Sequence, residues 1–202
     1  MNVQNDPRLL FKMDPDKYSL FFSILQQGFL VSAMVGCSIK SLLCDQFGVD
    51  PEYLSGRIST IFLNGRPVDN VESAIITQGD TLALSGAMPG LVGATFRKGG
   101  ILSVFRSSIT YENDIARIKT PVKGRITLKL FNLIVSEMGP AFLERGFWVT
   151  SLALCDFIER KKSNLHTDFN SITMNGHKIE PDALESLKGY DNQQLIHLTL
   201  SN

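Results

Sequence analysis

The sequence has a single tryptophan, three cysteines and three histidines among 202 residues, and its acidic and basic side chains are equal in number. Because no excess of basic residues marks a surface for nucleic acid or anionic lipid, we expect neither as a partner. An odd, sparse set of cysteines (Cys37, Cys44 and Cys155) argues against a disulfide framework. The closely spaced cysteine and histidine pairs of a zinc site are also missing, so we expect no metal and no cofactor.

Long apolar runs are missing too. No stretch approaches the roughly 20 apolar residues that a membrane-spanning helix needs. The opening MNVQNDPRLLFKMDPDK lacks the charged start, apolar run and small-residue cleavage site of a secretory signal. With 44% hydrophobic residues, the composition is that of an ordinary globular chain. We therefore expect a cytoplasmic protein.

The chain contains what we interpret as an internal duplication, covering residues 8–90 and 124–202. The stretch LCDQFGVDPEYLSGRISTIFLNG aligns without a gap on LCDFIERKKSNLHTDFNSITMNG. The spacing from Cys44 to Asn64 therefore equals that from Cys155 to Asn175. RLLFKM likewise matches RITLKL upstream, and TLALS matches HLTLS downstream. Since the matches share one order, duplication explains them better than chance.

Each copy is predicted to alternate short strands and helices. The first copy has strand, helix, strand, helix, strand, turn and strand, carried by RLLFKM, DPDKYSLFFSILQQG, FLVSA, SIKSLLCDQFG, ISTIFL, NG and GDTLALSG. The Asn-Gly pair favours a tight hairpin turn, because it tolerates positive φ at both central positions. In the second copy, Pro140 is expected to kink or shorten the first helix, since proline removes a backbone donor.

These elements carry a family resemblance. GCSIKSLLCDQFG, IFLNGRPVD and ITQGDTLALSGAMPG, with the strand–helix–strand opening, resemble the ubiquitin-like β-grasp sulfur carriers: the small subunit of molybdopterin synthase and its counterpart in thiamine biosynthesis. The resemblance implies an α+β fold of two tandem β-grasp modules, 1–93 and 124–202, the second more divergent. In each module a mixed sheet would wrap one main helix. Residues 94–123 would form a β-hairpin and connecting strands, with Gly99-Gly100 as the hairpin turn.

Carriers of this family act through a free C-terminal Gly-Gly that is adenylated and converted to a thiocarboxylate. Here Gly99-Gly100 is internal and the sequence closes on Ser201-Asn202. We therefore expect a non-enzymatic β-grasp protein that binds a protein partner. One alternative is a sulfur carrier activated by cleavage after Gly100, in molybdenum-cofactor or thiamine synthesis. Another is a small-ligand-binding protein with its site between the modules.

The stretch GAMPGLVG is the expected partner-binding element, because the resemblance implies a docking role for the tail that follows the closing strand. Its candidate residues are Gly86, Met88, Pro89, Gly90, Leu91, Val92 and Gly93. Either the side chains of Met88, Leu91 and Val92 meet a partner's groove, or they pack inward against the second module. The sequence is compatible with both arrangements of these side chains.

Two further groups of residues are weighed as sites. Arg97 and Lys98 are weaker candidates for contact with an anion or ligand, because neighbouring glycines let backbone N–H groups approach a phosphate. No residue is expected to be catalytic. The cysteines are interpreted as buried packing residues, and the scattered histidines as surface or structural residues: His166, His177 and His197.

Overall fold

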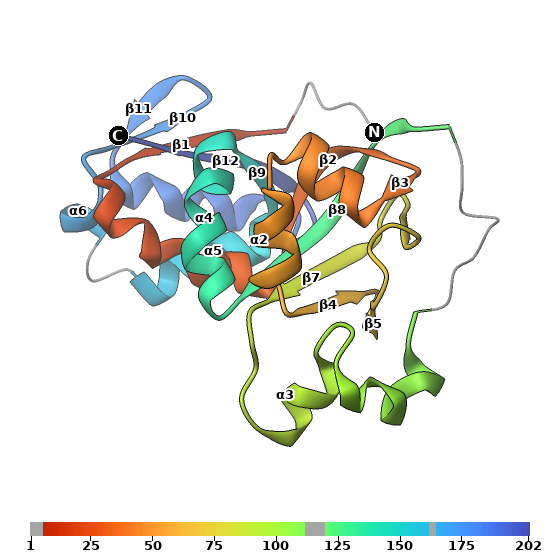
Figure 1. Cartoon of the computed structure of the whole chain (residues 1–202). Coiled ribbons are helices and arrows are strands. Elements are labelled where there is room, and N and C mark those ends of the chain that lie inside the picture. The colour runs from red at the N-terminus through yellow and green to blue at the C-terminus, as the bar shows by residue number, and fades with distance from the viewer. Residues whose placement is uncertain (1–5, 112–119, 162–164) are drawn as a thin grey trace. The chain divides into compact units, whose positions relative to one another are not determined.

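The computed structural model describes residues 6–111, 120–161 and 165–202. The chain forms an α+β protein with mixed β-sheet, divided into two compact units (Figure 1). The terminal unit consists of Met1–Phe29 and Met138–Asn202, and the central unit of Leu30–Glu137. Each unit therefore contains segments from both copies of the proposed duplication. Within the described ranges, no helix has the length and apolar character needed to cross a membrane.

The central unit has a sheet in the order β2-β8-β7-β4-β5. The parallel pair β7 and β8 lies at its centre, and β4 runs antiparallel to both β7 and β5. Its strands are β2 (Phe29–Val35), β8 (Val122–Phe131), β7 (Thr81–Ser85), β4 (Thr60–Leu63) and β5 (Arg66–Pro67), with the separate pair β3 (Cys37–Ser38) and β6 (Ile75–Ile76). Its helices are η3 (Ser41–Gln46, a π-helix), α2 (Pro51–Gly56), α3 (Gly90–Phe96) and the 3-10 helix η4 (Ile101–Ile109).

The terminal unit has a sheet in the order β9-β12-β1-β10-β11. The central parallel pair here is β1 and β12, flanked by antiparallel β10 and β9. Its strands are β9 (Phe147–Thr150), β12 (Leu195–Ser201), β1 (Arg8–Lys12), β10 (Ser171–Met174) and β11 (His177–Ile179). The helices are η2 (Pro15–Phe21), α1 (Phe22–Gln27), α5 (Ser151–Lys161), α6 (Leu165–Asp168) and η7 (Pro181–Gly189). Helix α4 (Leu133–Arg145) begins in the central unit and ends in this one.

The two sheets have the same pattern of parallel and antiparallel neighbours from β8 to β5 and from β12 to β11. The strands at corresponding positions of the two central pairs, however, do not come from corresponding places in the two sequence copies. In the central unit Leu63 of β4 faces Leu82 of β7, and in the terminal unit Met174 of β10 faces Leu9 of β1. The terminal sheet therefore has β1, the opening strand of the first copy, at the position where the central sheet has β7, the last strand of that copy. The strands predicted within the two copies and their Asn-Gly turns are confirmed, whereas this exchange of strands was not predicted.

Both Asn-Gly turns have the conformation that their sequence requires. Asn64 and Asn175 have φ of 51° and 53°, and each is followed by a glycine with positive φ. The Asn64 side chain accepts a hydrogen bond from the N–H of Thr81 at 2.8 Å, and it donates one to Asp80 at 2.7 Å. The Asn175 side chain accepts from the N–H of Arg8 at 2.9 Å. Each turn therefore fastens the end of β4 or β10 to the neighbouring strand.

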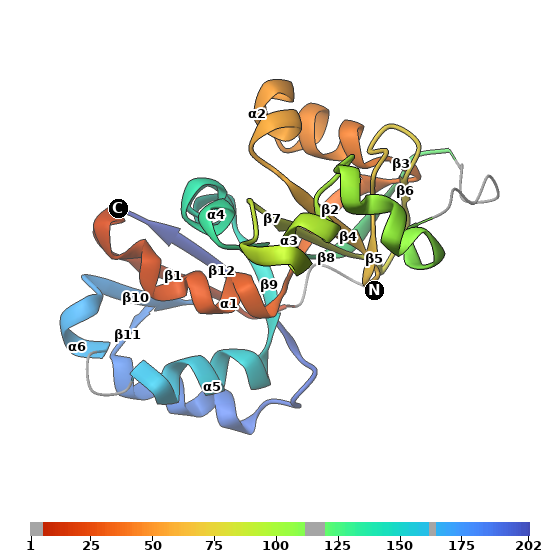
Figure 2. The same ribbon diagram turned by 60° about the horizontal axis from the view of Figure 1, so that its bottom comes forward.

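Aromatic side chains form the core of the terminal unit. Phe21 lies 5.4 Å from Phe11 and 4.7 Å from Phe157, measured between ring centroids. Figure 2 shows α1 and α5, the helices near these contacts, beside one another. The core of the central unit is aliphatic instead, with fully buried side chains from η3, β4, β7 and β8: Leu42, Leu43, Leu63, Leu82, Leu84, Ile126, Leu128 and Leu130.

Two local predictions are wrong. The expected hairpin at Gly99-Gly100 is not formed, because α3 precedes the glycines and η4 follows them. The apolar residues of ILSVFRSSI recur at three- and four-residue spacing, which favours a helix over a strand. The expected shortening of helix α4 at Pro140 is also wrong, because the helix continues through Pro140 to Arg145, while the expected kink stays a prediction. The backbone bond lost there is offset by burial of Phe142 and Leu143 on the same helix.

An ionic cluster ties α2 to the N-terminal part of α4 in the central unit. Arg57 forms an ion pair with Glu137, and the Tyr53 hydroxyl donates to the same carboxylate at 2.6 Å. The hydrogen bonds from Arg57 and Tyr53 lower the pKa of Glu137 from 4.5 to about 2. The charged carboxylate therefore stabilises the folded state.

We predict that Glu137 contributes to acid sensitivity within a defined pH window. Because its folded pKa of about 2 lies below its ordinary value of 4.5, its stabilisation is complete above pH 4.5 and is lost as the pH falls toward 2. The free energy of unfolding of the native protein and of Glu137→Gln should be measured by denaturant titration across this range. Their difference should shrink steadily as the pH falls; a difference independent of pH would contradict the prediction.

We also predict that the Asn64 turn contributes through both its backbone and its side chain. Asn64→Ala should lower the free energy of unfolding by about 2–3 kcal/mol, because it loses two hydrogen bonds and places alanine at positive φ. The matched control Asn64→Gly loses the same bonds but accepts the φ value, so it should cost about half as much. Equal losses in the two variants would show that the backbone conformation is of no consequence.

Candidate functional site

The candidate site lies on residues 87–111 of the central unit, which we call the α3–η4 segment. It follows β7 and contains both α3 and η4. In Figure 1 the segment extends away from the strands of its own unit. A peripheral segment of this kind needs its own attachments, since it adds no strand to the sheet.

The principal attachment is the side chain of Arg106, which is only 2% exposed. Its guanidinium forms a two-pronged ion pair with Asp69, with N–O distances of 2.7 and 3.0 Å. The same group donates to the carbonyl oxygen of Thr95 at 2.7 Å and to the Thr110 hydroxyl at 2.9 Å. One buried side chain of η4 therefore joins α3, η4 and the loop after β5.

Asp69 is the corresponding acceptor. Burial favours a higher pKa for its carboxyl, but hydrogen bonds from Arg106 and from the N–H of Gly99, with the charge of Arg106, hold the pKa below its usual value. The Gly99 bond measures 2.9 Å. Asp69 is therefore ionised near neutral pH and fastens both η4 and the turn before it.

Backbone and aromatic contacts complete the attachment. The N–H of Lys98 donates to the carbonyl oxygen of Ser59 at 2.7 Å, and the N–H of Tyr111 donates to that of Pro67 at 2.8 Å. The rings of Phe62 and Phe96 lie 5.3 Å apart. The segment is thus held at its middle and at its end.

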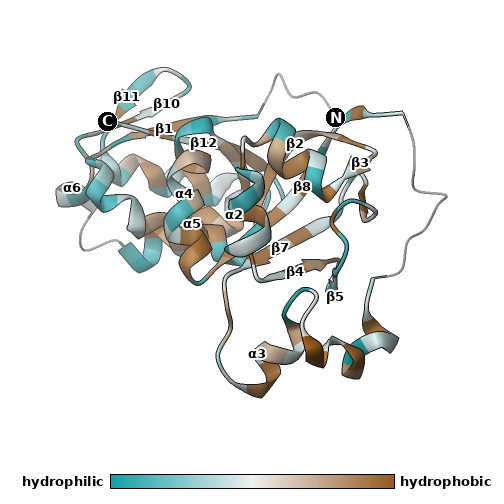
Figure 3. Ribbon diagram, in the orientation of Figure 1, coloured by the Kyte–Doolittle hydropathy of each residue, from teal (hydrophilic) through white to brown (hydrophobic). Residues whose placement is uncertain are grey.

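The outer side of the segment is strongly apolar and exposed. Ile101 is 94% exposed, Phe105 79% and Leu91 75%. Figure 3 shows hydrophobic colouring on α3 and along the helical turns that follow it. We call the set of exposed side chains the apolar face: Leu91, Val92, Ile101, Val104, Phe105 and Ile109. A face of this kind on a folded chain is typical of an interaction surface.

The expected partner-binding residues fall at the start of this segment. Leu91 and Val92 are exposed, as a docking role requires, whereas Met88 is half-buried. Gly86 and Gly93 are buried, while Pro89 and Gly90 are exposed. Gly93 is needed for close packing, because a Cβ atom there would overlap the backbone of Met88. The binding role of these residues stays a prediction.

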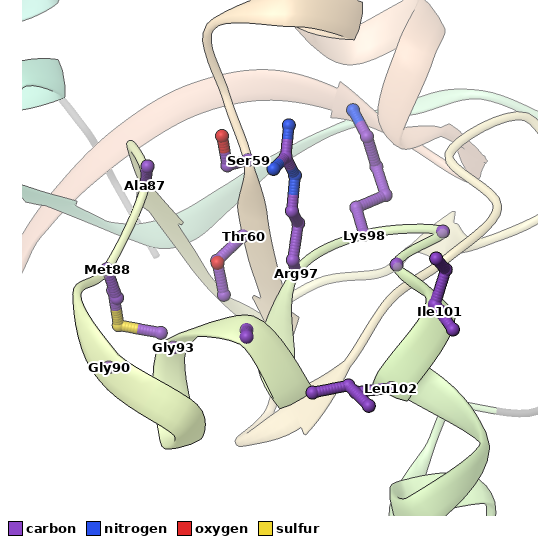
Figure 4. A pocket seen from close by; sticks show the side chains of 13 residues that line it. Ser59, Thr60, Ala87, Met88, Gly90, Gly93, Arg97, Lys98, Ile101 and Leu102 are labelled. Carbon is purple, nitrogen blue, oxygen red and sulfur yellow. The ribbon is translucent and has the colours of Figure 1, made fainter.

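Beneath α3 lies a pocket of about 560 Å³, formed entirely within the central unit. Figure 4 shows the side chains of Ser59 and Thr60 between Met88 on one side and Arg97 on the other. Thr60 is 1% exposed, and its hydroxyl has no hydrogen-bond partner among the described residues. The expected anion contacts Arg97 and Lys98 both line this pocket.

The two basic residues, Arg97 and Lys98, differ in the hydrogen bonds that their side chains form. The Lys98 ammonium donates to the carbonyl oxygen of Leu54 at 2.8 Å, and burial lowers its pKa. The Arg97 side chain is exposed, and in the described part of the chain it has neither an ion pair nor a hydrogen bond. Arg97 is therefore the basic side chain of the pocket that is available for a ligand.

The cysteines and histidines do not gather into a site within the described ranges, where no cluster of three metal-ligating side chains occurs. The cysteines are half-buried rather than fully buried, and burial raises the pKa of each thiol: Cys37, Cys44 and Cys155. His177 lies on β11, exposed as expected, and His197 lies in β12 against Trp148. His166 lies in α6.

Several important residues were missed by sequence reasoning. Asp69 and Arg106 are far apart in the chain, and no sequence pattern connects them. Thr60 looks like an ordinary strand residue, because the strand pattern does not show whether its hydroxyl finds a partner. The apolar face on η4 left a detectable signal, namely the helical spacing of Ile101, Val104 and Phe105, but this was read as a strand.

Comparisons of the chain with protein-family models, with curated proteins and with solved structures find no match.

We predict that Arg106 holds the α3–η4 segment in place. Arg106→Met should weaken the local attachment by about 2–3 kcal/mol, because it removes charge-assisted hydrogen bonds and leaves Asp69 without this partner. Trypsin cleavage after Arg97 and Lys98, which lie in the segment, should then accelerate by about 30- to 100-fold. Mass spectrometry of the early fragments measures this rate.

The matched control is Arg66→Met, which removes an exposed arginine from β5. It should leave cleavage within the segment unchanged. Equal cleavage rates in Arg106→Met and the native protein would show that the ion pair does not restrain the segment.

Proposed function

We propose that this chain is a non-enzymatic protein-binding protein of β-grasp type, which engages a protein partner through the apolar face of the α3–η4 segment. The observation that carries this proposal is the combination of exposure and anchoring. Six large apolar side chains are exposed on a segment that a buried ion pair fixes to the central unit.

The energetic argument starts from the exposed area. Full burial of a large apolar side chain contributes about 1.5–3 kcal/mol, so several such residues supply a substantial driving force for association. Ordering a flexible segment on binding would offset part of this gain. The contacts of Arg106 and Asp69 reduce that cost, because the segment is already held before a partner arrives.

The charges of the segment indicate the chemistry of the partner. Residues 87–111 include no acidic side chain and three basic ones, Arg97, Lys98 and Arg106. Arg106 is neutralised by Asp69, which leaves Arg97 as an exposed cation beside the apolar face. The surface that fits is an apolar groove on a protein, bordered by carboxylates that face Arg97.

The β-grasp assignment is supported by features of each sheet. Both units have a five-stranded mixed sheet with a parallel central pair, and both have an Asn-Gly turn between the outer strands. The resemblance to the sulfur carriers places the docking element after β7. The α3–η4 segment begins at that position, and therefore fits the proposal.

Cleavage after Gly100 to release a sulfur carrier is the less well supported function. The N–H of Gly100 donates to the carbonyl oxygen of Arg97 at 3.1 Å, and the preceding Gly99 is bonded to Asp69. A protease would have to open these contacts, and it would separate α3 from the arginine that anchors it.

We predict that the apolar face can be altered without unfolding the protein. The double variant Ile101→Ser, Phe105→Ser should change the melting temperature little, because both side chains are exposed in the free chain. Its binding to the native partner should fall at least about tenfold, since two apolar contacts are lost. Thermal unfolding, quantitative affinity purification from the native cells and titration with the purified partner measure these effects.

Leu152→Ser is the matched control, because Leu152 is an exposed apolar residue of α5 outside the segment. It should retain the partner. A large fall in melting temperature of the double variant, or equal binding by it and the control, would contradict the proposal. Self-association of the native chain that the double variant abolishes would identify a second copy as the occupant and overturn the proposed partner.

A further inference from the structure

The pocket beneath α3 has features that protein binding by the apolar face does not explain. It is lined by hydroxyl groups on one wall, by Arg97 on another and by apolar side chains at its rim. Its volume of about 560 Å³ lies within the range of about 300–1,000 Å³ that is usual for small-molecule sites.

The polar wall of the pocket consists of side chains that can donate further hydrogen bonds. The Thr60 hydroxyl is buried without a partner among the described residues, and a buried hydroxyl gains free energy when a ligand or a water accepts its hydrogen bond. Ser59 supplies a second hydroxyl to the lining. The guanidinium of Arg97 adds donors in a planar fork that matches carboxylate and phosphate oxygens.

The charge of the pocket favours an anion. All of its lining residues lie in the described part of the chain, and none of them is acidic. Arg97 is not neutralised within that part of the chain, in contrast to Arg106 beside it in the same segment. Among the described residues, no acidic side chain therefore compensates the positive charge of the pocket.

The apolar part of the lining indicates that the anion carries a carbon skeleton. Met88, Ile101 and Leu102 contribute thioether and aliphatic surface, and Ala87 and Ala94 leave space between them. A bare inorganic ion would leave this surface in contact with water. A short aliphatic chain would bury it.

We infer that this pocket binds a small organic oxyanion, a carboxylate or phosphate monoester with a short aliphatic part. Its oxygens accept from Arg97 and from the hydroxyls of Ser59 and Thr60, and its aliphatic part lies against Met88, Ile101 and Leu102. The inference goes beyond the proposed protein-binding function. Phe105, a central residue of the apolar face, does not line this pocket.

The test is a titration of the full chain with octanoate, octyl phosphate and 1-octanol, followed by isothermal calorimetry and by backbone NMR. Saturable binding of at least one of the two anions with a Kd below about 10 mM is expected. Shifts should centre on Thr60 and Arg97, and the neutral alcohol should bind at least about tenfold more weakly. The anion with the lower Kd identifies whether the pocket prefers a carboxylate or a phosphate group.

Variants separate the pocket from the rest of the molecule. Arg97→Gln should weaken anion binding at least about tenfold, and the control Arg66→Gln should leave it unchanged. Thr60→Val should weaken it by about three- to tenfold without lowering the melting temperature, because the hydroxyl has no partner to lose in the free protein. Phe105 does not line the pocket, so Phe105→Ser should retain anion binding even if it abolishes partner binding, and this variant distinguishes the two proposals.

Three results would overturn the inference. The first is no saturable binding of either anion, which would leave the buried Thr60 hydroxyl without a ligand partner. The second is equal affinity in Arg97→Gln and the native protein. The third is NMR shifts confined to the apolar face, which would show that only the octyl chain is recognised.

Discussion

The ion pair between Arg106 and Asp69 is the interaction on which the candidate site depends. A guanidinium that is 2% exposed is costly to bury unless its donors are satisfied. Here they reach a carboxylate, a backbone carbonyl and a hydroxyl. Because Asp69 also accepts from the N–H of Gly99, one pair of charges fixes both η4 and the turn before it. The segment then keeps its shape without adding a strand to the sheet.

This anchoring explains how one segment carries two different surfaces. On the inner side, Arg97, which directly precedes the fixed turn at Lys98 and Gly99, lines the pocket together with Thr60. On the outer side, the same attachment leaves Phe105 exposed, although Arg106 of the same helix is buried and Leu102 lines the pocket. Gly93 adds a steric requirement, because α3 packs on the backbone of Met88 so closely that a side chain would not fit. The pocket and the apolar face therefore share one support.

The sequence predicted local turns and strands more accurately than it predicted which strands pair with one another. The Asn-Gly turns and the strands next to them could be predicted, because positive φ and alternating burial leave local signals at Asn64 and Asn175. The placement of β1 in the terminal sheet and of β8 in the central sheet could not, since strand patterns show which residues are buried and not which partner strand buries them. The docking position after β7 was proposed from the sequence, but η4 was missed because a short apolar run fits both helix and strand. The pairing of Arg106 with Asp69 depends on tertiary structure alone.

Amide hydrogen exchange tests the central claim most directly, because it reports whether the α3–η4 segment is held on the central unit. The N–H groups of Lys98, Gly99 and Tyr111 donate to Ser59, Asp69 and Pro67 across the attachment. In the native protein at neutral pH we expect these three amides to exchange at least about 100-fold more slowly than in an unstructured peptide, because each must break a hydrogen bond to exchange. Exchange of all three at the unprotected rate would contradict the account, since the apolar face and the pocket would then have no common support.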